Sequence, residues 1–452
     1  MANADLGRYR RIVQMFWDPE PSNDIAQDQP VWCLGQQYRI RGRDGDDAET
    51  PDVSAVNLGP RHLACTTGDE AGAACPQHIA AAPKNAPDTP PESTASSISS
   101  TEYSNLSYEK GWPIKFLSDF ESRFWMTYRS EFQPIPRSTD SKATPALSLH
   151  VRLRSQLGDN GGFSSDSGWG CMIRSGQSLL ANTIGMIRLG REWRRGEKED
   201  GERDILRMFA DDPGAPYSIH KFVQHGASAC GKYPGEWFGP SATAQCIQAL
   251  VNRQASDMKV YSTGDGPDVY EDTFMKTATG GDGLFKPTLI LIGTRLGIDK
   301  ITPVYWEALI SALQMPQSVG IAGGRPSSSH YFVGAQGSFL FYLDPHHTRT
   351  AFPYRSAVSD YTKEEVDSCH TARLRRLHVR EMDPSMLIGF LIRSEEDWLQ
   401  WRRGVNHVQG KAIIHVADCD PSCKDGPDGR MGAIDEVETL SDDDSSTIAA
   451  DS

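Results

Sequence analysis

The sequence predicts an α+β fold that contains an antiparallel sheet. A helical block at residues 168–193 and a cluster of short apolar segments between residues 287 and 343 provide the two kinds of element. The helices come early, the strands come late, and the two do not alternate regularly along the chain. Regular alternation is the pattern of parallel sheets, so its absence favours antiparallel pairing.

The helical block follows from the spacing of its apolar residues. One side of a helix, with its period of about 3.6 residues, would carry six of them. They are Met172, Ile173, Leu179, Leu180, Ile184 and Ile187. Gly168 and Gly170 mark the entry into this helix.

The strand cluster consists of β-branched and aromatic runs separated by turn residues. The runs are residues 287–293, 319–322, 330–335 and 338–343. Gln336 and Gly337, between the last two runs, fit the two-residue turn of a β-hairpin. The segment 301–314, between the first two runs, is expected to be helical.

Composition divides the rest of the chain. With 452 residues the chain is long enough for two or three structural units. Residues 1–43 contain short aromatic segments that would form an edge strand or cover a core, so they are assigned to the folded unit. Residues 44–107 are rich in Asp, Ala, Pro, Ser and Thr and are expected to be a disordered insertion, because they cannot bury enough apolar area. The folded unit is expected to resume over 108–409, and the Asp-rich residues 410–452 are expected to be a disordered tail.

Two segments of the folded unit have a pattern of their own. Phe116, Phe120, Phe124 and the run from Met126 to Tyr128 recur at near-helical spacing. A polar loop is expected to follow, at residues 138–165.

Charge and cysteine content exclude several classes of protein. Lys and Arg number 46 against 60 for Asp and Glu, and the resulting net charge of −14 argues against nucleic-acid binding as the main activity. The first twenty residues contain no apolar signal-peptide region, and no run nears the roughly 20 apolar residues of a membrane helix. The 9 Cys are odd in number and scattered, so free thiols and a cytoplasmic location are expected.

The segment from Asp166 to Cys171 is the most informative part of the chain. Its Gly-Trp-Gly turn leads directly into the predicted helix, which places Cys171 at or near the helix N-terminus. The partial positive charge there favours thiolate over thiol, as a nucleophile requires. The alternative is an unreactive buried Cys, which is the commoner fate of a free thiol.

A thiolate nucleophile needs an imidazole as base and acid, and a group that orients the imidazole. The run 338–343 is followed by Asp344-Pro345-His346-His347, and at a spacing of two on an extended chain Asp344 and His346 face the same side. A surface turn is the alternative. His330 is a further candidate base, although its aromatic neighbours favour a structural role.

Five motifs in this order resemble the autophagins, the autophagy-related papain-like cysteine proteases. They are GWGCMIRSGQ, GEWFGP, GGRPSSSHYFVG, LFYLDPHHT and MDPSMLIGF. The resemblance implies a papain-like fold with a small added domain and a catalytic helix that begins at the nucleophile. It also implies two activities: cleavage of a ubiquitin-like autophagy modifier after its C-terminal Gly, and later release of that modifier from phosphatidylethanolamine. The implied partners are the free precursor and the lipid-conjugated modifier, with transient contact to autophagic membranes through the substrate. The implied locations are the cytoplasm, the nucleus and the autophagosome assembly site.

The same resemblance assigns roles to individual residues. Cys171 matches the family nucleophile, His346 its general base and acid, and Asp344 the residue that orients the imidazole. Tyr128 matches a Tyr whose hydroxyl joins the Cys171 N–H in an oxyanion hole, where the alternative is a core aromatic.

Three further residues match substrate-binding positions. Trp237 matches an aromatic residue that covers the site, where simple packing is the alternative. Gly324 and Pro326 match a lid over the cleft, where a plain surface turn is the alternative. A narrow covered tunnel could select a substrate that ends in Gly by excluding Cβ atoms.

Two minor motifs lie outside the resemblance. Tyr103 and Leu106 have the aromatic-x-x-aliphatic spacing of a peptide that docks by strand addition. Cys419 and Cys423, near His415, suggest a metal site or, with more support, a regulatory thiol pair.

Two rival functions remain open at this stage. One is a catalytically silent adapter for the modifier, and the other is a metallohydrolase with His346, His347 and Asp344 as ligands. The favoured function, a thiol hydrolase, requires neither metal nor cofactor.

Overall fold

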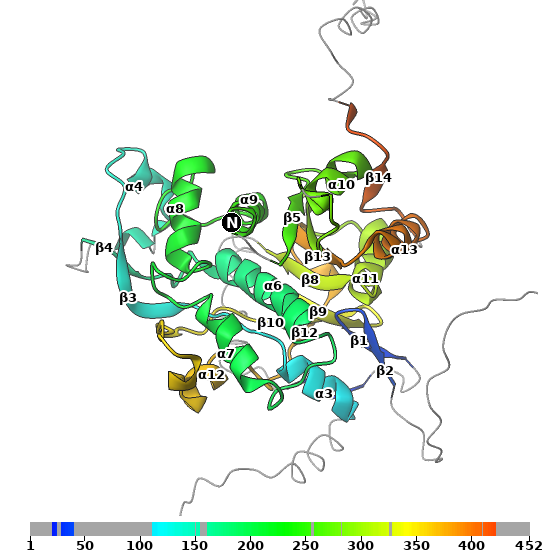
Figure 1. The fold of residues 1–452 in the computed structure, drawn as a ribbon, viewed down its shortest axis with the longest axis horizontal. Helices are drawn as coiled ribbons and strands as arrows, with labels where there is room; N and C mark the ends of the chain where they lie inside the picture. The colour runs from blue at the N-terminus through cyan, green and yellow to red at the C-terminus, as the bar shows by residue number, and fades with distance from the viewer. Residues whose placement is uncertain are drawn as a thin grey trace, which may run out of the picture. The chain divides into compact units, whose positions relative to one another are not determined.

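A nine-stranded sheet organises the part of the chain that the structure describes (Figure 1). This computed structural model describes residues 20–24, 29–39, 111–149, 151–153, 161–254, 257–281, 283–324, 328–408 and 410–421. The strands of the sheet are β1 (Val31–Cys33), β2 (Gln36–Tyr38), β5 (Lys259–Ser262), β7 (Thr288–Arg295), β8 (Ser318–Gly323), β9 (His330–Gln336), β10 (Phe339–Leu343), β12 (Arg376–His378) and β13 (Ser385–Ile392).

The pairing in this sheet is antiparallel almost throughout. The strand order is β12-β10-β9-β8-β13-β7-β5, with β1 added to β9 and β2 to β1. Only β5 and β7 run parallel within it. The predicted α+β class with an antiparallel sheet is therefore confirmed.

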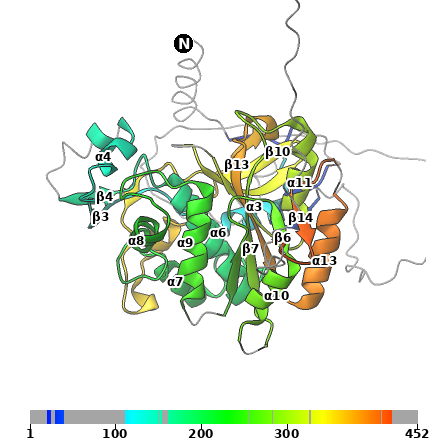
Figure 2. The same cartoon turned by 90° about the horizontal axis from the view of Figure 1, so that it is seen from above.

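Helices cover both faces of the sheet, as Figure 2 shows from above. One core cluster joins the sheet to α3 (Ile114–Glu121), α6 (Cys171–Arg188), α7 (Glu199–Arg207), α8 (Ile219–Ala229) and α9 (Pro240–Asn252). A second cluster, on the other face, joins it to α10 (Glu271–Thr279), α11 (Trp306–Gln314) and α13 (Glu395–Asn406). The central strands are apolar at nearly every position because successive side chains enter opposite cores. In β7, for example, Leu289 and Leu291 lie in the first cluster, and Ile290 and Ile292 lie in the second.

Smaller elements complete the described chain. A three-stranded sheet in the order β11-β3-β4 consists of β3 (Arg129–Pro136), β4 (Gly162–Ser165) and β11 (Arg349–Thr350). A parallel pair consists of β6 (Asp268–Tyr270) and β14 (His415–Ala417). The short helices are α4 (Ala143–Ala146), α12 (Lys363–Asp367) and the 3-10 turns η1 (Pro303–Tyr305), η2 (Val358–Asp360) and η3 (Val379–Glu381). In the described part of the chain no helix is both long enough and apolar enough to cross a bilayer.

Three expectations about the chain were wrong in part. The helical spacing from Phe116 to Tyr128 holds only as far as Glu121, where α3 ends, and the residues between α3 and β3 form neither helix nor strand. The loop expected at 138–165 contains α4 and β4. The disordered tail was placed too early, because β14 lies within it and the described residues continue to 421. The insertion 44–107 falls outside the described residues and stays a prediction.

Candidate active site

Cys171 is the first residue of α6 and is completely buried. Gly170 precedes it as a cap without a side chain, so no side-chain group competes for the free N–H groups at this helix end. A Cβ on Gly170 would lie 2.4 Å from Oδ2 of Asp166, which explains why the turn requires glycine. The structure thus places the thiol at the positive end of a helix, as expected from the sequence.

Asp166 fixes the turn that presents Cys171. Its backbone carbonyl accepts hydrogen bonds from the N–H groups of Gly170 at 2.8 Å and Trp169 at 3.1 Å. Its Oδ1 accepts from the Arg129 N–H at 2.6 Å, which joins the turn to the start of β3. Its Oδ2 pairs with Nε of Arg174 at 2.7 Å, one helical turn after the thiol.

The ion pair continues into the protein interior. Nη2 of Arg174 lies 2.8 Å from Oδ1 of Asp211, and the side chains of all three residues are at most 2% exposed. A buried cluster of this kind is rigid when every charge is paired. We therefore expect Asp166, Arg174 and Asp211 to hold the N-terminus of α6 against β3.

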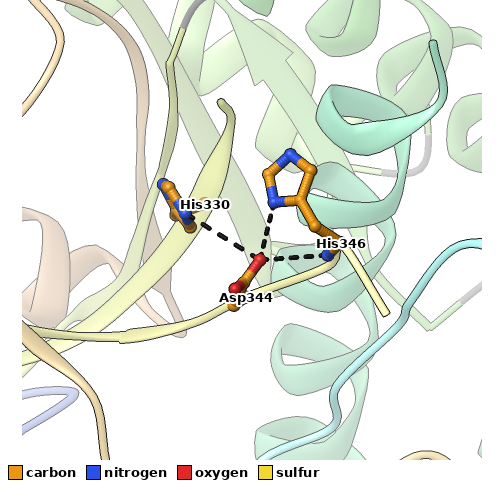
Figure 3. Close-up of side chains that lie close together, drawn as sticks. All are labelled: His330, Asp344 and His346. Carbon is orange, nitrogen blue, oxygen red and sulfur yellow. Dashed lines mark hydrogen bonds and ion pairs between the residues drawn. The ribbon is translucent and has the colours of Figure 1, made fainter. Parts of the chain in front are cut away.

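Asp344 and His346 follow the carboxyl end of β10 and are in direct contact (Figure 3). Oδ1 of Asp344 lies 2.6 Å from Nδ1 of His346 and accepts a second hydrogen bond, of 3.0 Å, from the His346 backbone N–H. The indole N–H of Trp125 donates to the Asp344 carbonyl at 2.7 Å. The expected juxtaposition of the two side chains is present, and the carboxylate fixes the ring so that Nε2 is the nitrogen left for chemistry.

Tyr128 lies beside this pair. Its backbone N–H donates to the Pro345 carbonyl at 2.8 Å, and its ring meets the His346 ring edge-on at a centroid distance of 5.4 Å. Its hydroxyl is buried, makes no hydrogen bond of ordinary geometry in the described part of the chain, and interacts with the Cys171 thiol. A buried hydroxyl donor beside the thiol suits a group that binds a transient oxyanion.

The site stabilises a thiolate and an imidazolium together. Burial raises the pKa of the Cys171 thiol, but the interaction with His346 outweighs burial and lowers that pKa to about 7. The Ser329 backbone N–H and the Tyr128 hydroxyl act in the same direction. Burial lowers the pKa of His346, but the hydrogen bond to Asp344 and the contact with Cys171 raise it to about 10.

A pH dependence follows from these two values. The rate at which iodoacetamide alkylates Cys171 is expected to rise as the pH increases through about 7, because the thiolate forms there. Turnover is expected to fall again as the pH approaches about 10, because His346 then loses the proton that a leaving amine needs. Alkylation rates and initial rates of turnover, measured between pH 5 and 10.5, test the expected rise near pH 7 and the expected fall near pH 10. An alkylation midpoint near the ordinary value of about 8.5 would show that His346 does not stabilise the thiolate.

Two further basic side chains, His330 and Arg375, lie beside Asp344. Oδ2 accepts from Nη1 of Arg375 at 2.6 Å, and Nε2 of His330 lies 3.9 Å from Oδ1. Burial raises the pKa of the Asp344 carboxyl, but its hydrogen bond to His346 and the charges of His330 and Arg375 hold that pKa well below its usual range. Sequence reasoning missed Arg375, and no local pattern distinguishes it from the neighbouring arginines.

The ligand atoms of His330, Asp344 and His346 lie within 4.8 Å of one another, which is close enough to consider a metal. The geometry favours the hydrogen-bonded pair instead. Nδ1 of His346 lies 2.6 Å from Oδ1 of Asp344. Two ligand atoms that are each about 2.1 Å from a tetrahedral zinc ion would lie farther apart than this. Arg375 already neutralises the carboxylate. His347 is a ligand in the metallohydrolase alternative, but its Nε2 lies 3.4 Å from Nη2 of Arg375.

The expected substrate-binding residues are placed in part. Trp237 lies in the turn before α9, packs partly against the first core cluster and has a buried indole N–H without a partner among the described residues. Gly324 follows β8 with φ of +146°, and a Cβ there would lie 2.4 Å from the Ser328 carbonyl oxygen. Pro326, Tyr103 and Leu106 lie outside the described residues.

The chain is similar to known cysteine proteases over nearly its whole length. A family model described as the peptidase C54 catalytic domain matches residues 113–404. "Cysteine protease ATG4" of Gibberella zeae is 62% identical over 470 residues, which cover 99% of this chain and 98% of that protein. "Probable cysteine protease atg4" of Sclerotinia sclerotiorum is 61% identical and covers 99% of both chains. "Cysteine protease 1" of Neurospora crassa is 55% identical and covers 98% of this chain and 91% of its own.

Proposed function

This chain belongs to the peptidase C54 family of cysteine proteases, and from that membership we propose that Cys171, His346 and Asp344 are its catalytic triad. The observation that carries the proposal is the place of Cys171, completely buried at the N-terminus of α6 and interacting with His346, which lowers its pKa to about 7. A structural Cys in such a place has its pKa raised, as burial does for Cys33 and Cys246. The contrast favours a nucleophile over an unreactive buried thiol.

The proposed reaction is acyl transfer to a thiol and then to water. The Cys171 thiolate attacks the carbonyl carbon of the substrate's C-terminal Gly, and the oxyanion accepts hydrogen bonds from the Cys171 N–H and the Tyr128 hydroxyl. His346 gives its proton to the departing amine, and the thioester forms. His346 then takes a proton from water, which attacks the thioester and releases the carboxylate and the thiol. Asp344 stays ionised and holds the ring throughout.

The proposed substrate is the ubiquitin-like autophagy modifier, as the resemblance to the autophagins implies. The departing amine belongs to a peptide when the precursor is processed, and to phosphatidylethanolamine when the conjugate is released. One site can serve both reactions, because the attacked acyl group is the same Gly and only the leaving amine differs. The proposed places of action are the cytoplasm, the nucleus and the autophagosome assembly site, with membrane contact through the lipid-bound substrate.

Product masses test this function directly. The full chain is incubated with the modifier carrying a short C-terminal extension and, separately, with the modifier conjugated to phosphatidylethanolamine in vesicles. Cleavage after the Gly in both samples, unaffected by a chelator, is the expected result. Binding without cleavage would favour the silent adapter, and cleavage that a chelator blocks would favour the metallohydrolase.

Tyr128→Phe tests the proposed oxyanion hole. Removal of one donor is expected to lower kcat by about 10²- to 10³-fold with little change in KM. Because the hydroxyl makes no hydrogen bond of ordinary geometry in the described part of the chain, its loss is expected to change Tm little. Steady-state kinetics and thermal unfolding measure these effects. An unchanged kcat would mean that Tyr128 is only a packed aromatic residue.

The cover over the cleft is also a proposal. We propose that Trp237, Gly324 and Pro326 contact the C-terminal residues of the modifier. The left-handed φ of Gly324 and the crowding at its Cβ position explain why that position needs glycine. Ser329, at the end of the same loop, contributes to the lowered pKa of Cys171, so movement of the loop would be felt at the thiol.

A further inference from the structure

We propose that Arg375 is a positioning residue, which keeps Asp344 ionised and turned toward His346 during turnover. The inference rests on the proposed triad and adds a fourth member to it. Arg375 touches neither the thiol nor the scissile bond in this proposal, so its effect would pass through Asp344.

Geometry is the first argument. Nη1 of Arg375 lies 2.6 Å from Oδ2 of Asp344, and both side chains are 9% exposed. Oδ1 of the same carboxylate accepts both hydrogen bonds from His346. With Oδ2 held by Arg375, the carboxylate plane is fixed, and Oδ1 is directed at Nδ1 of His346.

The sheet provides the second argument, because it holds the arginine itself in place. The Arg375 carbonyl accepts a 3.1 Å hydrogen bond from the N–H of Tyr342, two residues before Asp344. Arg376, the next residue, pairs with Phe341 in the β10–β12 ladder. Arg375 is therefore set by the strand that delivers Asp344, and rigid strands hold a site more accurately than loops do.

Competition for the carboxylate is the third argument. Nε2 of His330 lies 3.9 Å from the same Oδ1, and the His330 and His346 rings are 5.3 Å apart between centroids (Figure 3). Without a fixed Oδ2, the carboxylate could turn from one imidazole toward the other. Arg375 makes His346 the preferred partner.

The charge around Asp344 changes during the proposed reaction. His346 becomes neutral when it gives its proton to the leaving amine, and at that moment Asp344 loses the positive charge beside Oδ1. An arginine stays protonated at every pH at which the enzyme would work. The ionisable groups that face Asp344 and His346 are His330 on β9, His347 and Arg375 on one side, and Cys171 and Tyr128 beside His346. Arg375 supplies the charge that keeps Asp344 ionised through both half-reactions.

Arg375→Met tests the proposal, with Arg375→Lys as the conservative variant and Arg376→Met as the matched control. Arg376 is next in sequence, pairs with Asp24 and packs on Phe339. For Arg375→Met we expect kcat to fall by about 10- to 100-fold with KM nearly unchanged. The midpoint of iodoacetamide alkylation is expected to move up by about one pH unit, because a carboxylate that can turn toward His330 no longer holds the His346 imidazolium in place.

The two control variants sharpen the expectation. Arg375→Lys is expected to have the wild-type pH midpoint of alkylation but to recover only part of kcat. The ammonium group supplies the positive charge, but it lacks the planar geometry of the guanidinium. Arg376→Met is expected to have the wild-type pH midpoint of alkylation and the wild-type kcat, whatever its effect on Tm.

Alkylation uses no modifier, so the positioning role can be tested even if the proposed substrate is wrong. Rates are compared per folded molecule, since misfolded molecules would expose the buried thiols of Cys33, Cys246 and Cys369 as well. The proposal would be overturned if the pH midpoint of Cys171 alkylation in Arg375→Met stayed at the wild-type value and kcat was either unchanged or fell together with Tm. Arg375 would then be a structural residue only.

Discussion

Cys171→Ser is expected to lower kcat/KM for cleavage of the modifier by about 10⁵- to 10⁶-fold, the size of effect that loss of a nucleophile has in other triad hydrolases. The exchange replaces sulfur with oxygen in a completely buried position and leaves the helix N-terminus intact. A serine hydroxyl ionises far less readily than a thiol, and the site that lowers the Cys171 pKa to about 7 is matched to the thiol. Binding of the modifier should survive, so the variant is expected to form a stable complex that does not turn over.

Cys246→Ser is the matched control for this substitution. Cys246 is equally buried, but it lies within α9, and burial raises the pKa of its thiol. We expect activity per folded molecule to be unchanged in Cys246→Ser, even where Tm falls because a hydroxyl is buried. If Cys171→Ser retained more than about 1% of the wild-type rate, far above that expected loss, the nucleophile would have to be another group.

The strands and the helix that begins at Cys171 could be predicted because their signals are local. The runs that became β7 to β10 are bounded by turn residues, and burial on both faces makes them continuously apolar. The glycines before Cys171 mark the start of α6 within the predicted block. Asp344 and His346 were recognisable as a pair because the contact is between residues two apart on one strand end.

The segment after α3 shows why local spacing fails elsewhere. Its aromatic residues continue the helical period, but the backbone of Phe124 exchanges hydrogen bonds with the side chain of Asn182, and the N–H of Met126 donates to Ser178 Oγ. Both partners lie on α6, more than fifty positions away. These buried contacts satisfy the backbone of a segment that is neither helix nor strand and that leads to Tyr128, and a local pattern cannot show them.

Long-range pairing explains the other omissions. Arg375 lies in a run that also contains Arg373 and Arg376, and only the register of β12 on β10 decides which arginine reaches Asp344. The composition of the Asp-rich tail does not indicate β14 for the same reason. This strand forms by pairing with residues 268–270, which are far away in sequence. Composition indicates how a segment behaves alone and carries no information about a distant partner.

Asp344→Ala is expected to lower kcat/KM by about 10⁴-fold, less than loss of the thiol but more than loss of one oxyanion donor. The alanine removes the acceptor of both His346 hydrogen bonds and leaves Arg375 as a buried cation without its carboxylate. His346 is then free to turn, and its pKa should fall because the hydrogen bond that outweighs its burial is gone. With a weaker imidazolium beside it, Cys171 should be alkylated with a midpoint well above pH 7.

Asp344→Asn separates orientation from charge at the same position. An amide has one carbonyl oxygen, which can accept from His346 or from Arg375 but not from both in the present geometry, because its NH₂ group would face the other donor. We expect activity between those of wild type and Asp344→Ala, with the alkylation midpoint raised. Rates, alkylation midpoints and Tm for the two variants are the measurements. If both variants retained the wild-type midpoint near pH 7, Asp344 would not be the residue that stabilises the imidazolium, and the positioning role of Arg375 would fall with it.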